Sequence, residues 1–228
     1  MTSVLIISAN RGLGLEFVAQ YVAQGWHVYA ACRHPDSAEQ LQRLAQTAKG
    51  QIDILSMDVT NALSIAQAAA AIPNSAIDLL VNSAGITVQR SQIVGTIDYA
   101  AWAQVLDVNT MGPFRVLETF LEHIARSERK LVVTITTGMG SLADNTSGGS
   151  IAYRSSKAAV NMAMRSAAID LAPRGISCVL VNPGWVRTDM GGSGPSVFGK
   201  TESVTALRRL IETFGPAQSG KFFHYDGQ

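Results

Sequence analysis

Short β-branched segments alternate with longer segments rich in Ala and Leu from one end of this chain to the other. Most of the short segments are continuously apolar, which is typical of parallel strands covered on both faces. Strict alternation of this kind predicts right-handed crossovers and a parallel sheet. We therefore expect an α/β fold, a doubly wound Rossmann-type sheet with helices on both faces, formed by residues 1–228 as one domain.

Seven segments are predicted to be strands and six to be helices. The strands are expected at Ser3–Ala9, His27–Cys32, Ile52–Met57, Ile77–Val81, Leu131–Thr136, Ser177–Val181 and Lys221–Tyr225. The helices are expected at Gly12–Gln24, Ala38–Thr47, Ala62–Ala71, Met111–Arg126, Ile151–Leu171 and Ser203–Thr213. In such sheets the ligand binds beyond the carboxyl ends of the strands, so we look for functional residues there.

Composition limits the partners of this fold. The chain is 47% hydrophobic with a net charge of +1, so nothing electrostatic favours a nucleic acid or an anionic membrane. We see no membrane span and no charged leader before the first strand. Cys32 and Cys178 stand in apolar runs, where we expect buried reduced thiols. The four histidines lack metal-ligand spacing, so we expect no metal. From these properties together we predict a cytoplasmic enzyme that acts on a small-molecule substrate.

The turn after the first strand reads Ser8-Ala9-Asn10-Arg11-Gly12-Leu13-Gly14 and opens a helix. Glycines there allow a pyrophosphate to approach the backbone, and the helix N-terminus favours its negative charge. Two glycines at a strand-to-helix turn are also common as structural punctuation, so the motif alone leaves both interpretations open. In the context of the other motifs, we predict a dinucleotide site formed by Ser8, Asn10, Arg11, Gly12, Leu13 and Gly14.

The end of the second strand indicates which dinucleotide binds. An enzyme selective for NAD often places a carboxylate near this position, whereas this chain has Arg33, whose planar guanidinium suits a 2′-phosphate. Arg11 stands nearby, and His34-Pro35 is expected to turn the chain away before Asp36. We therefore favour NADPH over NADH, the alternative being that Arg33 is an exposed arginine at a strand end.

Two further strand ends offer nucleotide contacts. Asp58-Val59 follows the third strand, where Asp58 suits either the adenine amino group or the N-cap of the next helix. Asn82-Ser83-Ala84-Gly85 closes the fourth strand with small residues. We expect Asn82, Ala84 and Gly85 to let the cofactor lie flat against the backbone.

Tyr153 and Lys157 stand at the start of the long helix after the fifth strand. A spacing of four places them on one helix face, one turn apart. A tyrosine is a poor acid–base group near neutrality unless its anion is stabilised, and a neighbouring ammonium provides that stabilisation. We therefore predict that the charge of Lys157 lowers the pKa of Tyr153 and that its amine binds the nicotinamide ribose.

Polar groups follow other strands at the same edge. Thr136, Thr137 and Ser141 come after the fifth strand, and Asn109 enters the helix that precedes it. The segment Pro183-Gly184-Trp185-Val186-Arg187-Thr188 follows the sixth strand, and we expect Pro183, Gly184, Val186 and Thr188 to contact the cofactor. Polar groups at four strand ends thus converge on one crevice, which chance explains poorly.

These motifs resemble the short-chain dehydrogenase/reductase family over nearly the whole chain, and most closely the small carbonyl reductases of the sniffer and C-factor-like kind. The matching segments are 9–15, 31–33, 145–149, 152–157 and 220–227. The resemblance implies Tyr153 as general acid in reduction and Lys157 as its electrostatic partner. It also implies that Asn109 holds a water in the proton relay and that Thr137 orients the substrate carbonyl.

The sequence departs from the family pattern at three positions. Ser8 replaces the first glycine of the cofactor loop, Ser83 replaces an asparagine, and Thr137 replaces the catalytic serine. Threonine keeps the hydroxyl but adds a methyl group and a stiffer χ1. Ser141 is the alternative hydroxyl, and we place Thr137 ahead of it.

The family resemblance also implies pairing through the helices at 111–126 and 151–171, where the small residues Ala158, Ala159, Ala163 and Ala167 permit close approach. We expect a homodimer or homotetramer. A nucleotide-binding signalling or sensor protein with little or no turnover is the alternative function, although a sensor has no chemical need for Tyr153, Lys157 and Asn109. Substrate specificity is expected in the stretches Gly191–Gly199 and Asp144–Gly149, whose shapes the sequence does not define.

Overall fold

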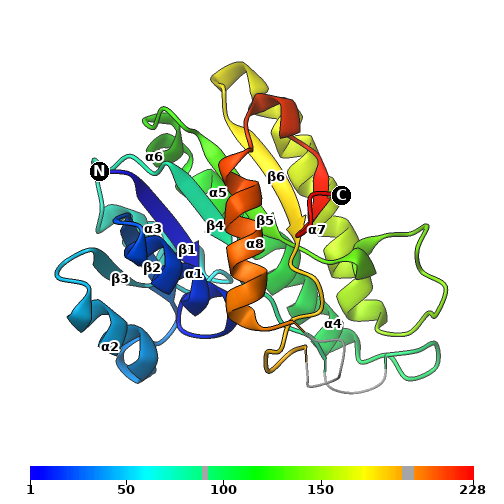
Figure 1. Ribbon diagram of the computed structural model, residues 1–228. Helices are drawn as coiled ribbons and strands as arrows, with labels where there is room; N and C mark the ends of the chain where they lie inside the picture. The colour runs from blue at the N-terminus through cyan, green and yellow to red at the C-terminus, as the bar shows by residue number, and fades with distance from the viewer. Residues whose placement is uncertain (89–91, 192–197) are drawn as a thin grey trace.

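The computed structural model describes residues 1–88, 92–191 and 198–228. One seven-stranded sheet crosses the molecule in the order β3-β2-β1-β4-β5-β6-β7, and every neighbouring pair is parallel (Figure 1). The strands are β1 (Ser3–Ile7), β2 (His27–Cys32), β3 (Ile52–Ser56), β4 (Leu79–Asn82), β5 (Leu131–Ile135), β6 (Ser177–Asn182) and β7 (Phe222–His224). The predicted Rossmann-type fold is confirmed, and the winding reverses between β1 and β4.

Helices cover both faces of the sheet. They are α1 (Gly12–Ala23), α2 (Glu39–Thr47), α3 (Ala62–Ala70), α4 (Tyr99–Leu106), α5 (Gly112–Thr119), α6 (Leu121–Ala125), α7 (Ile151–Asp170) and α8 (Lys200–Glu212). The helices α1, α2 and α8 contribute to one buried cluster, and α3, α5, α6 and α7 contribute to the other. The two clusters lie on opposite faces because successive strand residues point in opposite directions.

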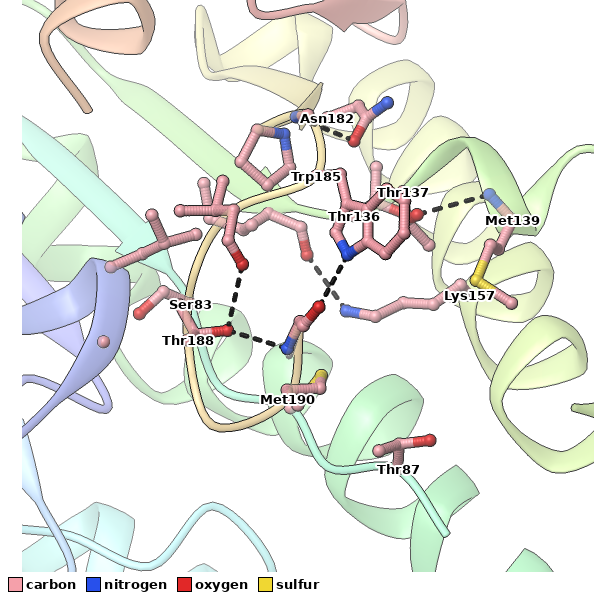
Figure 2. Close-up of a pocket in the computed structure, with 18 of the residues that line it drawn as sticks. Ser83, Thr87, Thr136, Thr137, Met139, Lys157, Asn182, Trp185, Thr188 and Met190 are labelled. Carbon is pink, nitrogen blue, oxygen red and sulfur yellow. Dashed lines mark hydrogen bonds between the residues drawn. The ribbon is translucent and has the colours of Figure 1, made fainter. Parts of the chain in front are cut away.

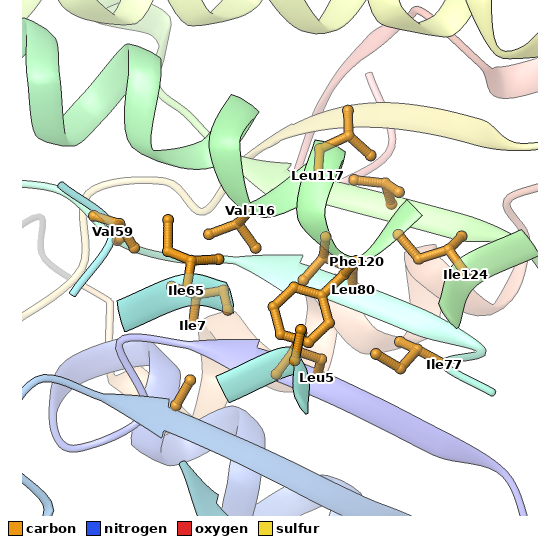
Figure 3. Packing of buried hydrophobic residues seen from close by; sticks show 14 of the residues in the cluster. Leu5, Ile7, Val59, Ile65, Ile77, Leu80, Val116, Leu117, Phe120 and Ile124 are labelled. Atoms are coloured by element: carbon orange, nitrogen blue, oxygen red, sulfur yellow. The ribbon is translucent and has the colours of Figure 1, made fainter. Parts of the chain in front are cut away.

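The strand β1 shows this alternation directly. Leu5 and Ile7 belong to the cluster beneath α3 and α5, together with Phe120 (Figure 3). Val4 and Ile6 belong to the cluster on the other side. All five residues of β1 are buried, which explains why the sequence of this strand is almost entirely apolar.

The predicted helix at Met111–Arg126 is wrong in detail. It is divided into α5 and α6 at Phe120, and a π-helical turn at Asp107–Met111 precedes it. The sequence analysis also missed α4, which begins after Asp98, whose carboxylate accepts a hydrogen bond from Ala101 N at 2.9 Å. An aspartate before an Ala-rich segment is an N-cap signal that predicts this helix. The other elements match their predictions to within a few residues at either end.

Within the described residues, no helix has the length and apolarity needed to cross a membrane. Cys32 and Cys178 are both buried free thiols, as expected. The predicted insert at Gly191–Gly199 is described only at its ends, because residues 192–197 lie outside the described part of the chain.

Candidate active site

A cleft of about 890 Å³ lies at the carboxyl ends of the strands. Many of the predicted site residues line it: Ser8, Arg11, Gly12, Leu13, Gly14, Ala84, Gly85, Thr137, Tyr153, Lys157, Pro183, Gly184, Val186 and Thr188. Figure 2 shows part of this lining, in which Thr136, Thr137, Lys157 and Trp185 surround one space. The fold therefore brings together residues that are up to 180 positions apart in the sequence.

The two glycines of the first turn are required for different reasons. Gly12 has a φ of +59°, a left-handed conformation that favours glycine. A Cβ at Gly14 would overlap the carbonyl oxygen of Ser8, so no side chain fits there. Ser8 itself has a φ of +64°, although it carries a side chain. Glycine is the least strained residue at that angle, so Ser8 introduces backbone strain into the cofactor loop.

The N-terminus of α1 is open to an anion. The helix N-cap is Arg11, whose side chain makes no capping hydrogen bond, whereas Asn61 caps α3 through its side chain. Arg11 forms an exposed ion pair with Asp189 at 2.6 Å, which joins this loop to the segment after β6. Free helix N–H groups and a nearby guanidinium are the groups that bind phosphate, so these residues fit a dinucleotide pyrophosphate.

The residues expected to recognise the adenosine end lie beyond the cleft lining. Arg33 is exposed at the end of β2, and Asp58 lies near it after β3. Burial acts to raise the pKa of Asp58, but hydrogen bonds from Thr60 and the charges of Arg33 and His34 bring the pKa below its ordinary value. Asp58 is not the N-cap of α3, because Asn61 accepts the bond from Ser64 N at 3.1 Å. The N-cap interpretation of Asp58 is therefore wrong.

Three other expected cofactor contacts do not line the cleft through their side chains. The side chain of Val59 belongs to the core against Gly112 (Figure 3), and Asn82 is buried with its Nδ2 donating to Pro113 O at 3.5 Å. Asn10 also lies outside the lining. Ser83 does line the cleft, and its hydroxyl donates to Ile7 O at 2.6 Å, which ties the end of β4 to the end of β1.

On the first turns of α7, Lys157 is buried and Tyr153 is half-buried. Lys157 is only 5% exposed, its Nζ donates to Ile135 O at 3.1 Å, and Nζ lies 6.0 Å from the centre of the Tyr153 ring. Burial lowers the pKa of Lys157 from 10.5 to about 8 and raises the pKa of Tyr153 from 10.0 to about 12. The predicted lowering of the tyrosine pKa is therefore wrong for this state, because loss of hydration dominates and Lys157 donates to a carbonyl instead.

Thr137 lies beside these two groups. It is extended, its Oγ1 accepts a 3.3 Å hydrogen bond from Met139 N, and it lines the cleft (Figure 2). Ser141 lines a separate hollow of about 460 Å³, and its Oγ accepts a hydrogen bond from Asp144 N. Of the two candidate hydroxyls, only Thr137 lies in the same cavity as Tyr153.

Asn109 is completely buried in the π-helical turn and does not line the cleft. Its Oδ1 accepts from Ile86 N at 2.8 Å, and its Nδ2 donates to Ile86 O and to Ser156 Oγ. A Cβ at Gly85 would lie 3.6 Å from both Asn109 Oδ1 and Lys157 Nζ. Asn109 therefore holds the segment after β4 against α7, close to the buried lysine.

The segment after β6 closes one side of the cleft. Trp185 Nε1 donates to Gly191 O at 2.6 Å, and Gly191 N donates to Thr188 Oγ1 at 3.0 Å (Figure 2). The backbone of Val186 also forms an isolated bridge with Phe198. These contacts define the shape of this strap, residues 184–191.

Several residues that line the cleft were not predicted from the sequence: Thr87, Ile135, Met139, Ser150, Asn182, Phe198, His224 and Tyr225. Asn182 and His224 end the neighbouring strands β6 and β7, whose register pairs them. Their position at the carboxyl ends of parallel strands was the available signal. Among residues 1–88, 92–191 and 198–228, no group of His, Cys, Asp or Glu is placed to hold a metal ion.

Comparison with known proteins agrees with this geometry. The chain matches the short chain dehydrogenase family over residues 2–196. It belongs to this family. The C-signal of Myxococcus xanthus is 42% identical over 151 residues, which are 66% of this chain and 90% of that protein.

Solved structures extend the likeness over the whole chain. The NADPH-bound carbonyl reductase from chicken fatty liver has a TM-score of 0.93 and 32% identity, covering 100% of this chain and 98% of that one. The carbonyl reductase Sniffer of D. melanogaster has a TM-score of 0.92 and 31% identity, with the same coverage. The resemblance to sniffer-type and C-factor-like members of the short-chain dehydrogenase family is confirmed.

Proposed function

We propose that this protein is an NADPH-dependent oxidoreductase that reduces a carbonyl group to an alcohol, with Tyr153 as the proton donor. The observation that carries this proposal is the placement of Tyr153, Lys157 and Thr137 in the same cleft as an uncapped, glycine-bordered helix N-terminus. A proton donor beside a dinucleotide site is what carbonyl reduction requires. The similar chicken protein is a carbonyl reductase with NADPH bound.

The half-buried Tyr153 carries the proton that the reaction needs. Burial raises the pKa of its hydroxyl to about 12, so proton donation to a carbonyl oxygen requires a nearby cation that stabilises the tyrosinate. Thr137 Oγ1 would hold that oxygen, and Lys157 would favour the tyrosinate that remains after proton transfer. Bound NADPH would supply the hydride that reaches the carbonyl carbon. The products balance as one alcohol and one oxidised dinucleotide.

Cofactor selection is assigned to the exposed arginines. Arg33 stands at the end of β2 with Asp58 nearby, and Arg11 stands at the N-terminus of α1. A guanidinium forms two parallel hydrogen bonds to a phosphate, which NADPH carries on its ribose and NADH lacks. We therefore assign Arg33 to the 2′-phosphate, with Arg11 as a second cation for the phosphates.

A signalling role without turnover is the second candidate function, and the likeness to the C-signal of M. xanthus favours it. A sensor needs the nucleotide half of the cleft but has no chemical use for a lysine buried beside a tyrosine. Burying an amine costs stability, so a protein with no chemical use for Lys157 would gain nothing from keeping it there. The catalytic half therefore argues for the enzyme.

We also propose that the protein is a cytoplasmic homodimer or homotetramer. Met162 and Ile169 on α7 are 67% and 60% exposed, which gives that helix an apolar outer surface. Both cysteines are free, which suits a reducing compartment. Sedimentation at several protein concentrations tests the assembly, and a monomer at all concentrations would contradict it.

The function is tested by the oxidation of NADPH in the presence of aldehydes and ketones, with wild type and Tyr153→Phe in parallel. The variant keeps the ring but loses the proton donor, so we expect kcat to fall by about a thousandfold. The dissociation constant for NADPH should change less than twofold, because the phenyl ring fills the same space. Tight NADPH binding by the wild type without any turnover would favour the sensor.

A further inference from the structure

Two residues at the rim of the cleft have no role in the proposed reaction. Asn182 ends β6 and His224 ends β7, and the parallel register pairs them. Both line the cavity that contains Tyr153 and Thr137. They lie beside the catalytic segment, because a Cβ at Gly138 would be 3.7 Å from Asn182 Nδ2 and 4.0 Å from His224 Cε1. The pair therefore packs within van der Waals distance of the residue that follows Thr137.

The hydrogen bonds of this pair define which ring nitrogen is free. Gly184 N–H can only donate, and it donates to Asn182 Oδ1 at 3.2 Å. The other end of the amide, Nδ2, therefore faces His224 Nδ1 at 3.0 Å and donates to it. With Nδ1 as acceptor, the neutral ring carries its proton on Nε2. Among the described residues, none forms a hydrogen bond with Nε2.

The backbone holds His224 in this place. His224 N donates to Gln228 O at 2.7 Å, and Gly227 N donates to His224 O at 2.9 Å, which forms a tight turn. The next residue, Tyr225, packs against Phe198 with ring centres 4.8 Å apart and closely covers Gly184. The backbone of His224 and the Nδ1 of its imidazole are therefore both held by hydrogen bonds. The exposed edge of the ring remains available at the cleft.

We infer that His224 is a specificity residue, whose Nε2–H donates a hydrogen bond to a second oxygen of the substrate, beyond the carbonyl that is reduced. This inference rests on the proposed function, because it assumes a substrate carbonyl at Thr137 and Tyr153. The donor is a neutral N–H, so the substrate class is a ketone that carries a second, uncharged acceptor oxygen nearby, such as the ester carbonyl of a keto ester, in preference to a simple ketone.

The test compares ethyl 3-oxobutanoate with 2-heptanone, two methyl ketones of equal chain length that differ in the ester group. The readout is the ratio of their kcat/KM values in wild type, His224→Leu and His224→Gln. We expect the leucine variant to lower this ratio about five- to tenfold, mainly through KM for the keto ester. The glutamine variant, which keeps an N–H donor at a similar distance, should stay within about twofold of wild type.

Melting temperature and NADPH affinity show whether each variant is folded. An unchanged ratio in the leucine variant would overturn the inference, and so would an equal loss in the glutamine variant, because packing and not the N–H would then explain it. Both results leave the proposed function standing, because turnover persists. Failure of the wild type to oxidise NADPH with any carbonyl would instead overturn the proposed function and this inference with it.

Discussion

The two halves of the cleft solve different physical problems. The catalytic half, formed by the ends of β4 and β5 and the start of α7, contains a buried charge, because its lysine is 5% exposed. The nucleotide half, formed by the ends of β1 and β2, presents cations to solvent, with the Arg11 side chain 56% exposed. The catalytic half is preorganised at a cost in stability, whereas the cations of the nucleotide half gain their binding partner only when the phosphates of the cofactor arrive.

The difference shows where binding energy and catalytic energy originate. A solvated arginine is inexpensive to maintain and contributes only when a phosphate arrives. A buried amine lowers the free energy of unfolding whether or not a ligand is bound, so its presence here indicates a chemical role at that position. The contrast predicts that changes in the catalytic half affect turnover and stability, while changes in the nucleotide half affect cofactor affinity.

The largest effect is expected for Lys157→Met, which removes the buried charge and keeps the side-chain volume. Turnover should fall by at least about a hundredfold. The free energy of unfolding without cofactor should rise by about 3 kcal/mol at pH 7, since burial lowers the pKa of Lys157 from 10.5 to about 8. Both quantities are measured on the same preparation, by steady-state kinetics and by denaturant unfolding.

The pH dependence sharpens that prediction. Below pH 8, Lys157 is charged in the folded and unfolded chains, so the full burial cost is present. Above about pH 8 the folded chain releases this proton while the unfolded chain keeps it, so the cost shrinks as the pH approaches 10. The stability difference between variant and wild type should therefore decrease from pH 7 to pH 10. A variant that is less stable than wild type at pH 7 would refute the account of the catalytic half.

An intermediate effect is expected for Arg33→Ala in the nucleotide half. Affinity for NADPH should fall about tenfold, while affinity for NADH should change less than twofold, because only NADPH carries the 2′-phosphate. Arg43→Ala is the matched control, since Arg43 is also exposed and pairs only with Glu39 on α2 among the described residues. Calorimetric titration measures both affinities. An equal loss for NADPH and NADH would assign Arg33 to general electrostatic attraction.

The smallest effect is expected for Ser8→Gly, which relieves the positive φ in the cofactor loop. Relief of the left-handed strain exceeds the added entropy of the unfolded chain by about 0.5 kcal/mol. NADPH should bind about two- to threefold more tightly. Lys49→Gly is the control, because Lys49 has a φ of +48° far from the cleft. It should show a similar gain in stability, measured by thermal unfolding, with no change in NADPH affinity.

The sequence predicted the fold well because buried parallel strands leave a strong apolar pattern, as in the five residues of β1. It missed α4, whose N-cap at Asp98 is a single-residue signal. The break at Phe120 and the π-helical turn around Asn109 were missed too, although Pro113 at the start of α5 is a local signal against one regular helix.

The candidate site was predictable where a motif carries it and hidden where only topology does. The positions of Tyr153, Lys157 and Thr137 in one cleft follow from strand ends and helix spacing. The pKa of Tyr153 did not follow, because its direction depends on burial that the sequence cannot measure. Asn182 and His224 were missed because no motif joins β6 to β7, and their pairing arises from the register of the finished sheet.

Carbonyl reduction by this protein is tested by following hydride transfer itself, with NADPH deuterated at C4 of the nicotinamide and a small ketone. We expect the alcohol product to carry deuterium on the carbinol carbon, and we expect that product to be lost in Tyr153→Phe although NADPH still binds. Binding of NADPH to the wild type with no deuterated alcohol from any carbonyl compound tested would contradict it and leave a nucleotide sensor as the function.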